Sequence, residues 1–242
     1  MLGWIAAGTD RVQAVAPWIA SRLIALHPPL ASRLDVDPMG IELPAFGTTP
    51  PPPPPLRILF VGRLVPRKGV STLLEAMMMA PETLLTIVGD GPERPRLELL
   101  ARPLGDRARF LGERSPRDVD VLTPRHHVIA APSLPYPRGG EGTPTAVLAA
   151  MGAGLVPVAS ATGGLADLLA FGDLGIAVPP GDAVALAAAL RTLAAAPRTL
   201  DVLADRARLS SFKHAWPQAA ARVEARLQCA RASGTRPQDR VQ

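Results

Sequence analysis

Two stretches of the chain carry side chains suited to holding a charged ligand. The first is the loop Gly62–Gly69 (GRLVPRKG), which comes after the apolar run Ile58–Val61. Gly62 permits a tight turn, Arg63 can grip phosphate oxygens through its forked guanidinium, and Lys68 adds a compact second charge. Two cations that converge on a diphosphate would stabilise a departing nucleotide. The alternative is an ordinary solvated loop with surface cations.

The second stretch is Arg138–Thr145 (RGGEGTPT), which leads into an apolar helical pattern. We expect Thr143 to cap that helix and Pro144 to take its first position. The free N–H groups and partial positive charge of the helix start, together with Gly142, would then face a diphosphate. Glu141 lies just outside the helix, where its carboxylate either accepts hydrogen bonds from sugar hydroxyls or simply favours the helix dipole.

Four other features are weaker candidates. The turn Gly89–Pro92 lacks the spacing of a dinucleotide-binding loop and favours a structural role. The Asp118-Val119-Asp120 string does not come after a hydrophobic strand, which disfavours a metal site. The adjacent His126 and His127 favour a surface or strand-edge role. Asp167, after two glycines, either lines the ligand site or is a helix-start acid.

From Leu56 onward, short apolar strands alternate with helices, and this order predicts an α/β fold with a Rossmann-like, doubly wound parallel sheet. Open parallel sheets bind ligands at the carboxyl ends of their strands, where both candidate stretches lie. The predicted strands are Ile58–Val61, Leu84–Val88, Arg109–Leu111, His127–Ala131, Val156–Ser160 and Ile176–Val178, and the main helices are Val70–Met79, Arg94–Ala101, Thr145–Ala153 and Ala183–Ala195.

The region before Leu56 is too short to bury a core of its own. Ile5–Ala7 and Pro38–Ile41 have the pattern of strands, and apolar residues recur at helical spacing from Val12 to Leu23. We expect this piece to pack on the remainder of the chain or to be the edge of something larger. The predicted division is an N-terminal fragment (1–48), a stiff polyproline linker or surface loop (49–55), a Rossmann-like domain (56–198) and a helical, arginine-rich tail (199–242).

Composition limits the classes of function. The chain has 242 residues, 48% of them hydrophobic, and 26 basic against 21 acidic side chains. This positive balance suits phosphate-bearing ligands or an anionic membrane face, with a compositional preference for arginine as the alternative. The sequence contains no cluster of basic residues interleaved with aromatics, so its pattern does not indicate nucleic-acid binding. The sequence has a single cysteine, Cys229, and no apolar run of transmembrane length, which together favour a cytoplasmic protein. Peripheral contact with the inner face of the membrane stays open as an alternative.

The chain resembles GT-B glycosyltransferases of family 4 over residues 56–195. The stretches that carry the resemblance are ILFVGRLVPRKGV, LTIVGDGPERPRLELL, ARFLGE, APSLPYPRGGEGTPTAVLAAMGAGLVPVAS, TGGLADLL and GIAVPPGD. The resemblance implies hexosyl transfer from a nucleotide-sugar donor, commonly a UDP- or GDP-sugar, with retention of anomeric configuration. It implies no bound metal and no other cofactor.

The resemblance also assigns roles to single residues. Arg63 and Lys68 match the cations that contact the donor diphosphate, and Glu141 matches the first glutamate of an E-x7-E motif, which contacts the donor sugar. Gly142 and Thr143 match the backbone around the phosphates, and Pro144 and Thr145 at the helix start are further donor-binding candidates. Asp167 stands where the family has a glutamate. The second glutamate of the motif is Ala149 here, and loss of its hydrogen bond to ribose would cost roughly 1.5–3 kcal/mol, or about ten- to a hundredfold in affinity.

Both ends of the chain resemble pieces of the family's acceptor half. AVAPWIASRL and DPMGIEL resemble its last helix and strand, and SFKHAWPQAAARVEARL resembles the helix that crosses back to it. Most of the acceptor domain is therefore expected to be missing, and a second chain would have to supply it for transfer to an unknown acceptor. The alternatives are a degenerate or non-catalytic nucleotide-sugar-binding module and a nucleotide-sugar epimerase.

Overall fold

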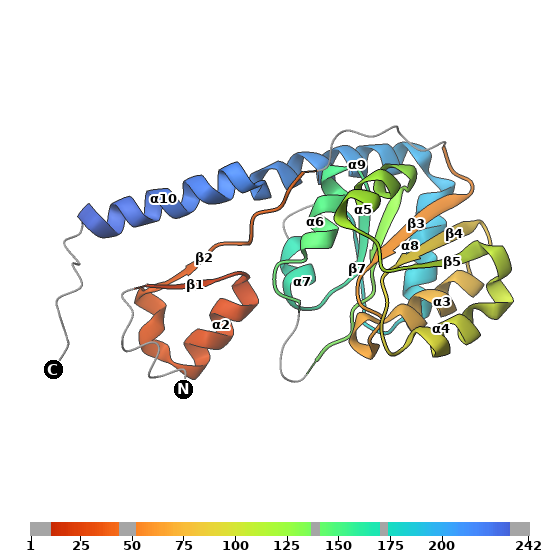
Figure 1. Cartoon of the computed structure of the whole chain (residues 1–242), viewed down its shortest axis with the longest axis horizontal. Helices are drawn as coiled ribbons and strands as arrows, with labels where there is room; N and C mark the ends of the chain where they lie inside the picture. Colours follow the sequence, from red (N-terminus) through yellow and green to blue (C-terminus); the bar gives the residue numbers. More distant parts are fainter. Residues whose placement is uncertain (1–10, 44–51, 137–140, 170–173, 233–242) are drawn as a thin grey trace.

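The computed structural model describes residues 11–43, 52–136, 141–169 and 174–232. Its centre is a parallel sheet of six strands in the order β5-β4-β3-β6-β7-β8, with helices on both faces (Figure 1). This arrangement confirms the predicted α/β fold with a doubly wound, Rossmann-like sheet. The strands are β3 (Leu56–Val61), β4 (Thr83–Val88), β5 (Ala108–Gly112), β6 (Val128–Ala131), β7 (Val156–Ser160) and β8 (Ile176–Val178).

The strand order reverses between β3 and β6. From β3 the chain moves outward to β4 and β5, and it then returns to place β6 on the other side of β3. Because neighbouring strands are parallel, their carboxyl ends lie at one edge of the sheet. The loops after β3 and β6 therefore diverge at a topological switch point, the place where open α/β sheets bind ligands.

The apolar run Ile58–Val61 of β3 results from burial on both faces of the sheet. Ile58 and Phe60 belong to one buried cluster, and Leu59 belongs to another on the opposite face. A strand covered on both sides needs no polar alternation, so its pattern is recognisable in the sequence. The first face is covered by α3 (Val70–Met78), α4 (Arg94–Ala101) and α8 (Ala183–Ala195), and the second by α5 (Pro116–Leu122), α6 (Thr145–Gly152) and α7 (Gly163–Leu169). Residues of α9 (Pro197–Ser211) contribute to both buried clusters.

Residues 11–43, here called the N-terminal segment, form β1 (Val12–Ala14), α2 (Pro17–Leu26) and β2 (Leu34–Val36). The two strands pair in parallel, and α2 packs against α7 of the sheet domain. The expectation that the helix reaches back to Val12 is wrong, since residues 12–14 form a strand. Proline restricts the residue before it to extended conformations, so α2 begins at Pro17.

The strand expected at Pro38–Ile41 lies earlier in the sequence, at β2. Of the predicted residues, Ile41 forms an isolated bridge with Ala215 and no longer ladder. The apolar stretch Ile5–Ala7 falls outside the described residues, as do residues 44–51, which include the first three residues (49–51) of the predicted linker. Pro52–Pro55 lead directly into β3.

The last described helix, α10 (Trp216–Ala232), lies along the N-terminal segment (Figure 1). Asp37, only 1% exposed, forms ion pairs with Arg222 at 2.8 Å and with Arg226 at 3.2 Å. Gly40 packs so closely on Trp216 that an added Cβ would lie 2.4 Å from the indole ring. These contacts join the N-terminal segment to α10.

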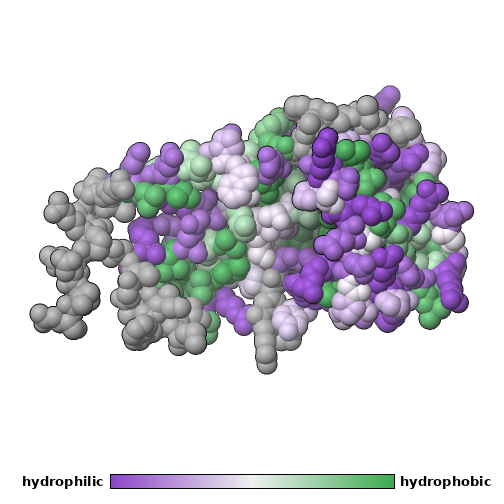
Figure 2. All heavy atoms as spheres, in the orientation of Figure 1, coloured by the Kyte–Doolittle hydropathy of each residue, from purple (hydrophilic) through white to green (hydrophobic). Residues whose placement is uncertain are grey.

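The surface differs between the two parts of the molecule. In Figure 2, hydrophobic side chains gather over the N-terminal segment, whereas hydrophilic ones dominate the visible face of the sheet domain. Within the described residues, no single helix combines the length and apolarity needed to cross a membrane. Residues 183–195 and 197–214 meet that test only jointly, as a pair bent by 105°.

Candidate functional site

A charged pair occupies the switch point. Lys68 comes after β3, Glu141 comes after β6, and the Lys68 ammonium lies 2.6 Å from Oε1 of Glu141. Ser133 donates a hydrogen bond to the same carboxylate oxygen at 3.1 Å. The two charged side chains are 21% and 17% exposed. The fold thus brings together one predicted residue from each candidate loop in a largely buried ion pair.

A hollow of about 110 Å³ lies beside this pair. Its walls come from the carboxyl ends of β3 and β6 and from the first turn of α6. The predicted residues that line it are Lys68, Glu141, Thr143, Pro144 and Thr145. A helix start, a cation and a carboxylate therefore share one concave surface, which is the chemistry expected of a site for phosphate and sugar groups.

Arg63 and Gly62 do not line the hollow. The Arg63 side chain is exposed on the same loop as Lys68, and within the described residues it makes no hydrogen bond or ion pair. A Cβ at Gly62 would meet only ordinary van der Waals contacts. The backbone of this loop is instead in close contact with Gly89, whose φ is +127° and whose added Cβ would lie 2.0 Å from the Gly62 carbonyl oxygen. The glycine-rich turn after β4 thus packs against the candidate loop.

The start of α6 differs from the expectation. Pro144 is the N-cap, the helix begins at Thr145, and no side chain caps it. The expectation that Thr143 caps this helix is therefore wrong. Its hydroxyl donates to the Val15 carbonyl oxygen at 2.8 Å and accepts from the Met39 backbone N–H at 3.1 Å. Thr143 thus connects the helix start to the N-terminal segment.

Trp18 is a site-adjacent residue that the sequence interpretation missed. Its indole Nε1 donates to the backbone carbonyl of Glu141 at 2.7 Å, and Gly164 donates to the same oxygen at 2.8 Å. A Cβ at Gly164 would lie 1.8 Å from the Gly142 carbonyl oxygen. The backbone of the Glu141 loop is therefore held between α2 and α7. A tryptophan in a chain with only 4% aromatic residues was a signal of importance but not of this contact.

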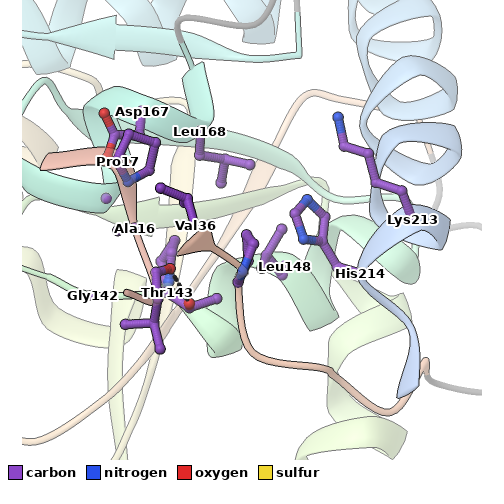
Figure 3. A pocket seen from close by; sticks show the side chains of 14 residues that line it. Ala16, Pro17, Val36, Gly142, Thr143, Leu148, Asp167, Leu168, Lys213 and His214 are labelled. Atoms are coloured by element: carbon purple, nitrogen blue, oxygen red, sulfur yellow. Dashed lines mark hydrogen bonds between the residues drawn. The ribbon is translucent and has the colours of Figure 1, made fainter. Parts of the chain in front are cut away.

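Asp167 lies on the far side of the same loop. Its Oδ2 accepts a hydrogen bond from the Trp18 backbone N–H at 3.2 Å, near the start of α2. It lines a second, apolar cavity of about 220 Å³ between the N-terminal segment, α6, α7 and the short turn η5 (Phe212–His214) that precedes α10 (Figure 3). The His214 imidazole also lines this cavity, and burial, with help from the charges of Lys213 and Arg222, lowers its pKa to about 4.

The weaker candidates have structural contacts. Ser115 caps α5 by accepting from the Asp118 backbone N–H, and its hydroxyl donates to the Asp118 carboxylate. His126 and His127 are buried rather than on the surface, and His127 Nδ1 accepts from the Arg57 backbone N–H. Across the described ranges, no three His, Cys, Asp or Glu side chains are grouped so that they could hold a metal ion. Independence from metals stays a prediction.

Comparisons with known proteins agree with this geometry. Residues 46–210 match the family of glycosyl transferases group 1. The chain is 32% identical over 181 residues to the amylovoran biosynthesis glycosyltransferase AmsK of Erwinia amylovora, covering 71% of this chain and 44% of that protein. It is 35% identical over 162 residues to the phosphatidyl-myo-inositol mannosyltransferase of Mycolicibacterium smegmatis, covering 63% and 41%.

Solved structures show the same fold. Sucrose-phosphate synthase from Thermosynechococcus elongatus superposes with a TM-score of 0.79 at 28% identity, covering 93% of this chain and 59% of that one. HepE of Anabaena, in complex with UDP and glucose, gives a TM-score of 0.78 at 20% identity, covering 91% and 64%. At that identity the second likeness concerns the fold alone.

The match to the family extends over more than half of the chain, from the linker through most of α9. The chain spans less than half the length of AmsK and of the mannosyltransferase. Both of those relatives are glycosyltransferases by name. On the strength of this match, the chain belongs to the glycosyl transferases group 1 family.

Proposed function

We propose that this chain is the donor-binding half of a retaining GT-B glycosyltransferase of family 4, and that it binds a nucleotide-diphosphate sugar at the switch point. The observation that carries the proposal is the Lys68–Glu141 pair beside the start of α6. The two residues come from loops 73 positions apart, and the fold places them where open α/β sheets hold ligands. The HepE structure contains UDP and glucose, which supports a ligand of this class.

The ion pair suggests how a donor would enter. Without a ligand, the Lys68 ammonium is neutralised by Glu141. A diphosphate carries more negative charge than one carboxylate and would take over Lys68. The released Glu141 carboxylate would then accept hydrogen bonds from the hydroxyls of the sugar. Binding and orientation of the donor are thus coupled through one exchange of partners.

Other groups would complete the donor site. Thr145 and Pro144 at the start of α6 direct the positive end of the helix dipole at the hollow. Arg63 is exposed and unpaired within the described residues, so its guanidinium is free to close over the diphosphate from the solvent side. A hollow of about 110 Å³ holds only part of such a donor, and the nucleotide would extend over the surface near Arg63.

Transfer needs an acceptor half that this chain supplies only in part. The N-terminal segment and α10 leave large apolar side chains exposed, among them Met39, Trp216 and Leu227. We infer that further polypeptide, in this or another chain, covers this surface and binds the acceptor. The alternative is a non-catalytic nucleotide-sugar-binding module, and Ala149 in place of the second motif glutamate favours it.

Calorimetric titration with UDP and GDP tests the donor site. We expect saturable binding of one of them, unaffected by EDTA. Ala149→Glu should tighten that binding by about ten- to a hundredfold if the new carboxylate reaches the ribose hydroxyls. Ala153→Glu, one turn further along and past the end of α6, is the matched control and should leave the affinity unchanged. Absence of binding to any nucleotide-sugar or nucleoside diphosphate would contradict the proposal.

A further inference from the structure

A cavity of about 300 Å³ lies at the opposite end of the strands that carry the candidate donor site. It is formed near the amino ends of β3, β4 and β5, on the sheet face that also carries Leu59. Its polar lining consists of Arg57, Thr86, Asp106, Arg107, Arg109 and His126. The proposed donor chemistry uses none of these side chains.

Two of the arginines stand on the same face of the sheet, on either side of β4. Arg57 pairs in register with Leu84, and Arg109 pairs with Thr86. Leu84 and Thr86 are two residues apart, so their side chains point to the same face. Arg57 and Arg109 are separated by two strand-to-strand spacings across the sheet and by an offset of two residues along the strands. Their Cα atoms therefore lie roughly 12 Å apart, a distance that two long side chains can bridge together.

Neither guanidinium has a partner of opposite charge. Within the described residues, the side chains of Arg57 and Arg109 form no hydrogen bond and no ion pair. The carboxylate of Asp106, the acidic residue in the lining, is also without a partner within the described residues.

The remaining walls are fixed by hydrogen bonds. Arg107 Nη1 donates to the carbonyls of Met77 and Ala80 at 3.1 and 3.2 Å. His126 Nδ1 lies 2.9 Å from the Leu122 carbonyl oxygen, and its Nε2 lies 2.8 Å from the Thr86 hydroxyl. Because a carbonyl only accepts, Nδ1 carries the proton and Thr86 donates to Nε2. The cavity is therefore a preformed concave surface.

Charge and size together indicate the ligand. Three guanidinium groups against one carboxylate leave a local excess of two positive charges. Guanidinium forks match the oxygens of both phosphate and carboxylate groups. A phosphate ester carries about −1.5 to −2 charge at pH 7 and so balances this excess better than a single carboxylate does. At roughly 30 Å³ for each water, the cavity has room for about ten waters, which exceeds a bare phosphate ion. The space suits a phosphate group with a small molecule attached.

We propose that this cavity binds the phosphate group of a small phosphorylated metabolite in solution, with Arg57 and Arg109 as the ligands of its oxygens. The site is separate from the switch point and does not depend on the proposed donor chemistry. Arg107 contributes charge from a fixed position, and Asp106 lies in the wall where a hydroxyl of the attached group would meet an acceptor.

Titration of the full chain with inorganic phosphate and with glucose 6-phosphate, monitored by phosphorus NMR and calorimetry, tests the proposal. We expect saturable binding that weakens at least tenfold in Arg57→Gln/Arg109→Gln and is unchanged in Arg198→Gln. Arg198 is an exposed arginine of α9 outside the cavity and gives the same change in charge. Because Arg57 is half-buried, Arg109→Gln alone serves as a second variant, at an exposed position where folding is not at risk.

Three results would overturn the proposal. The first is no saturable phosphate binding. The second is a loss of binding in Lys68→Met rather than in the arginine variants, which would place the phosphate at the switch point. The third is that the arginine variants weaken only the co-sedimentation of the protein with vesicles containing phosphatidic acid and leave the binding of soluble phosphates unchanged. The ligand would then be a membrane surface.

Discussion

The two ends of β3 carry cations in opposite situations. At the carboxyl end, Lys68 already has a partner, Glu141, at 2.6 Å. At the amino end, Arg57 of β3 and Arg109 of β5 face one cavity, and neither has a partner among the described residues. A paired cation can bind an anion only by exchanging its partner, and that exchange couples two events. Two cations that have no anionic partner gain a counter-charge directly from the ligand, without any exchange.

The largest effect is expected at the paired end. Lys68→Met removes one member of a largely buried ion pair and leaves the Glu141 carboxylate uncompensated. We expect a loss of about 1–3 kcal/mol in the free energy of unfolding, and a fall of about ten- to a hundredfold in affinity for a nucleoside diphosphate. Urea unfolding and calorimetry measure the two quantities.

Arg67→Met is the matched control for this change, since it removes a cation from an exposed position of the same loop. It should alter neither quantity appreciably. If Lys68→Met and Arg67→Met change the free energy of unfolding and the nucleotide affinity equally, the pairing of Lys68 with Glu141 contributes to neither quantity.

A smaller effect is expected from Trp18→Phe, which removes the hydrogen bond to the Glu141 carbonyl while keeping an aromatic ring. We expect a loss of about 1 kcal/mol in stability and a several-fold weaker nucleotide affinity, because the Glu141 loop is less firmly held. Trp216→Phe makes the same change at a ring that packs on Gly40, away from the loop. Equal effects of both variants on affinity would show that Trp18 acts only through general stability.

The last effect concerns pH and involves His126 in the cavity at the unpaired end and His214 in the apolar cavity beside α6. Burial lowers the pKa of His126, helped by the nearby charge of Arg57, and it lowers the pKa of His214 to about 4. Below pH 6.5 the unfolded chain takes up protons at these histidines while the folded chain does not. The free energy of unfolding should therefore decline as the pH falls from 6.5 towards 4.

Urea unfolding at about pH 7 and about pH 5, on either side of the ordinary histidine pKa, measures this decline. His214→Gln should make it shallower, because the group that is held neutral in the folded state is gone. A decline of the same size in the variant would remove His214 as a cause.

The sequence alone was sufficient for the six strands and the main helices of the sheet domain, whereas α5 and α7 were not among the predicted helices. The strands and main helices expected there lie within two residues of their observed bounds, because burial on both faces gives strands such as β3 an unbroken apolar run that needs no tertiary information. The convergence of the loops after β3 and β6 was also predictable, because parallel strands of one sheet end at one edge.

Only the tertiary structure decided which side chains meet across elements. Thr143 has the side chain of a helix cap, yet its hydroxyl bonds to Val15, because the N-terminal segment lies within reach and offers a backbone carbonyl. Arg57 and Arg109 lie on different strands and share a cavity solely through the register of β3, β4 and β5. Local periodicity fixes the faces of an element, whereas contacts between elements depend on packing that no local pattern encodes.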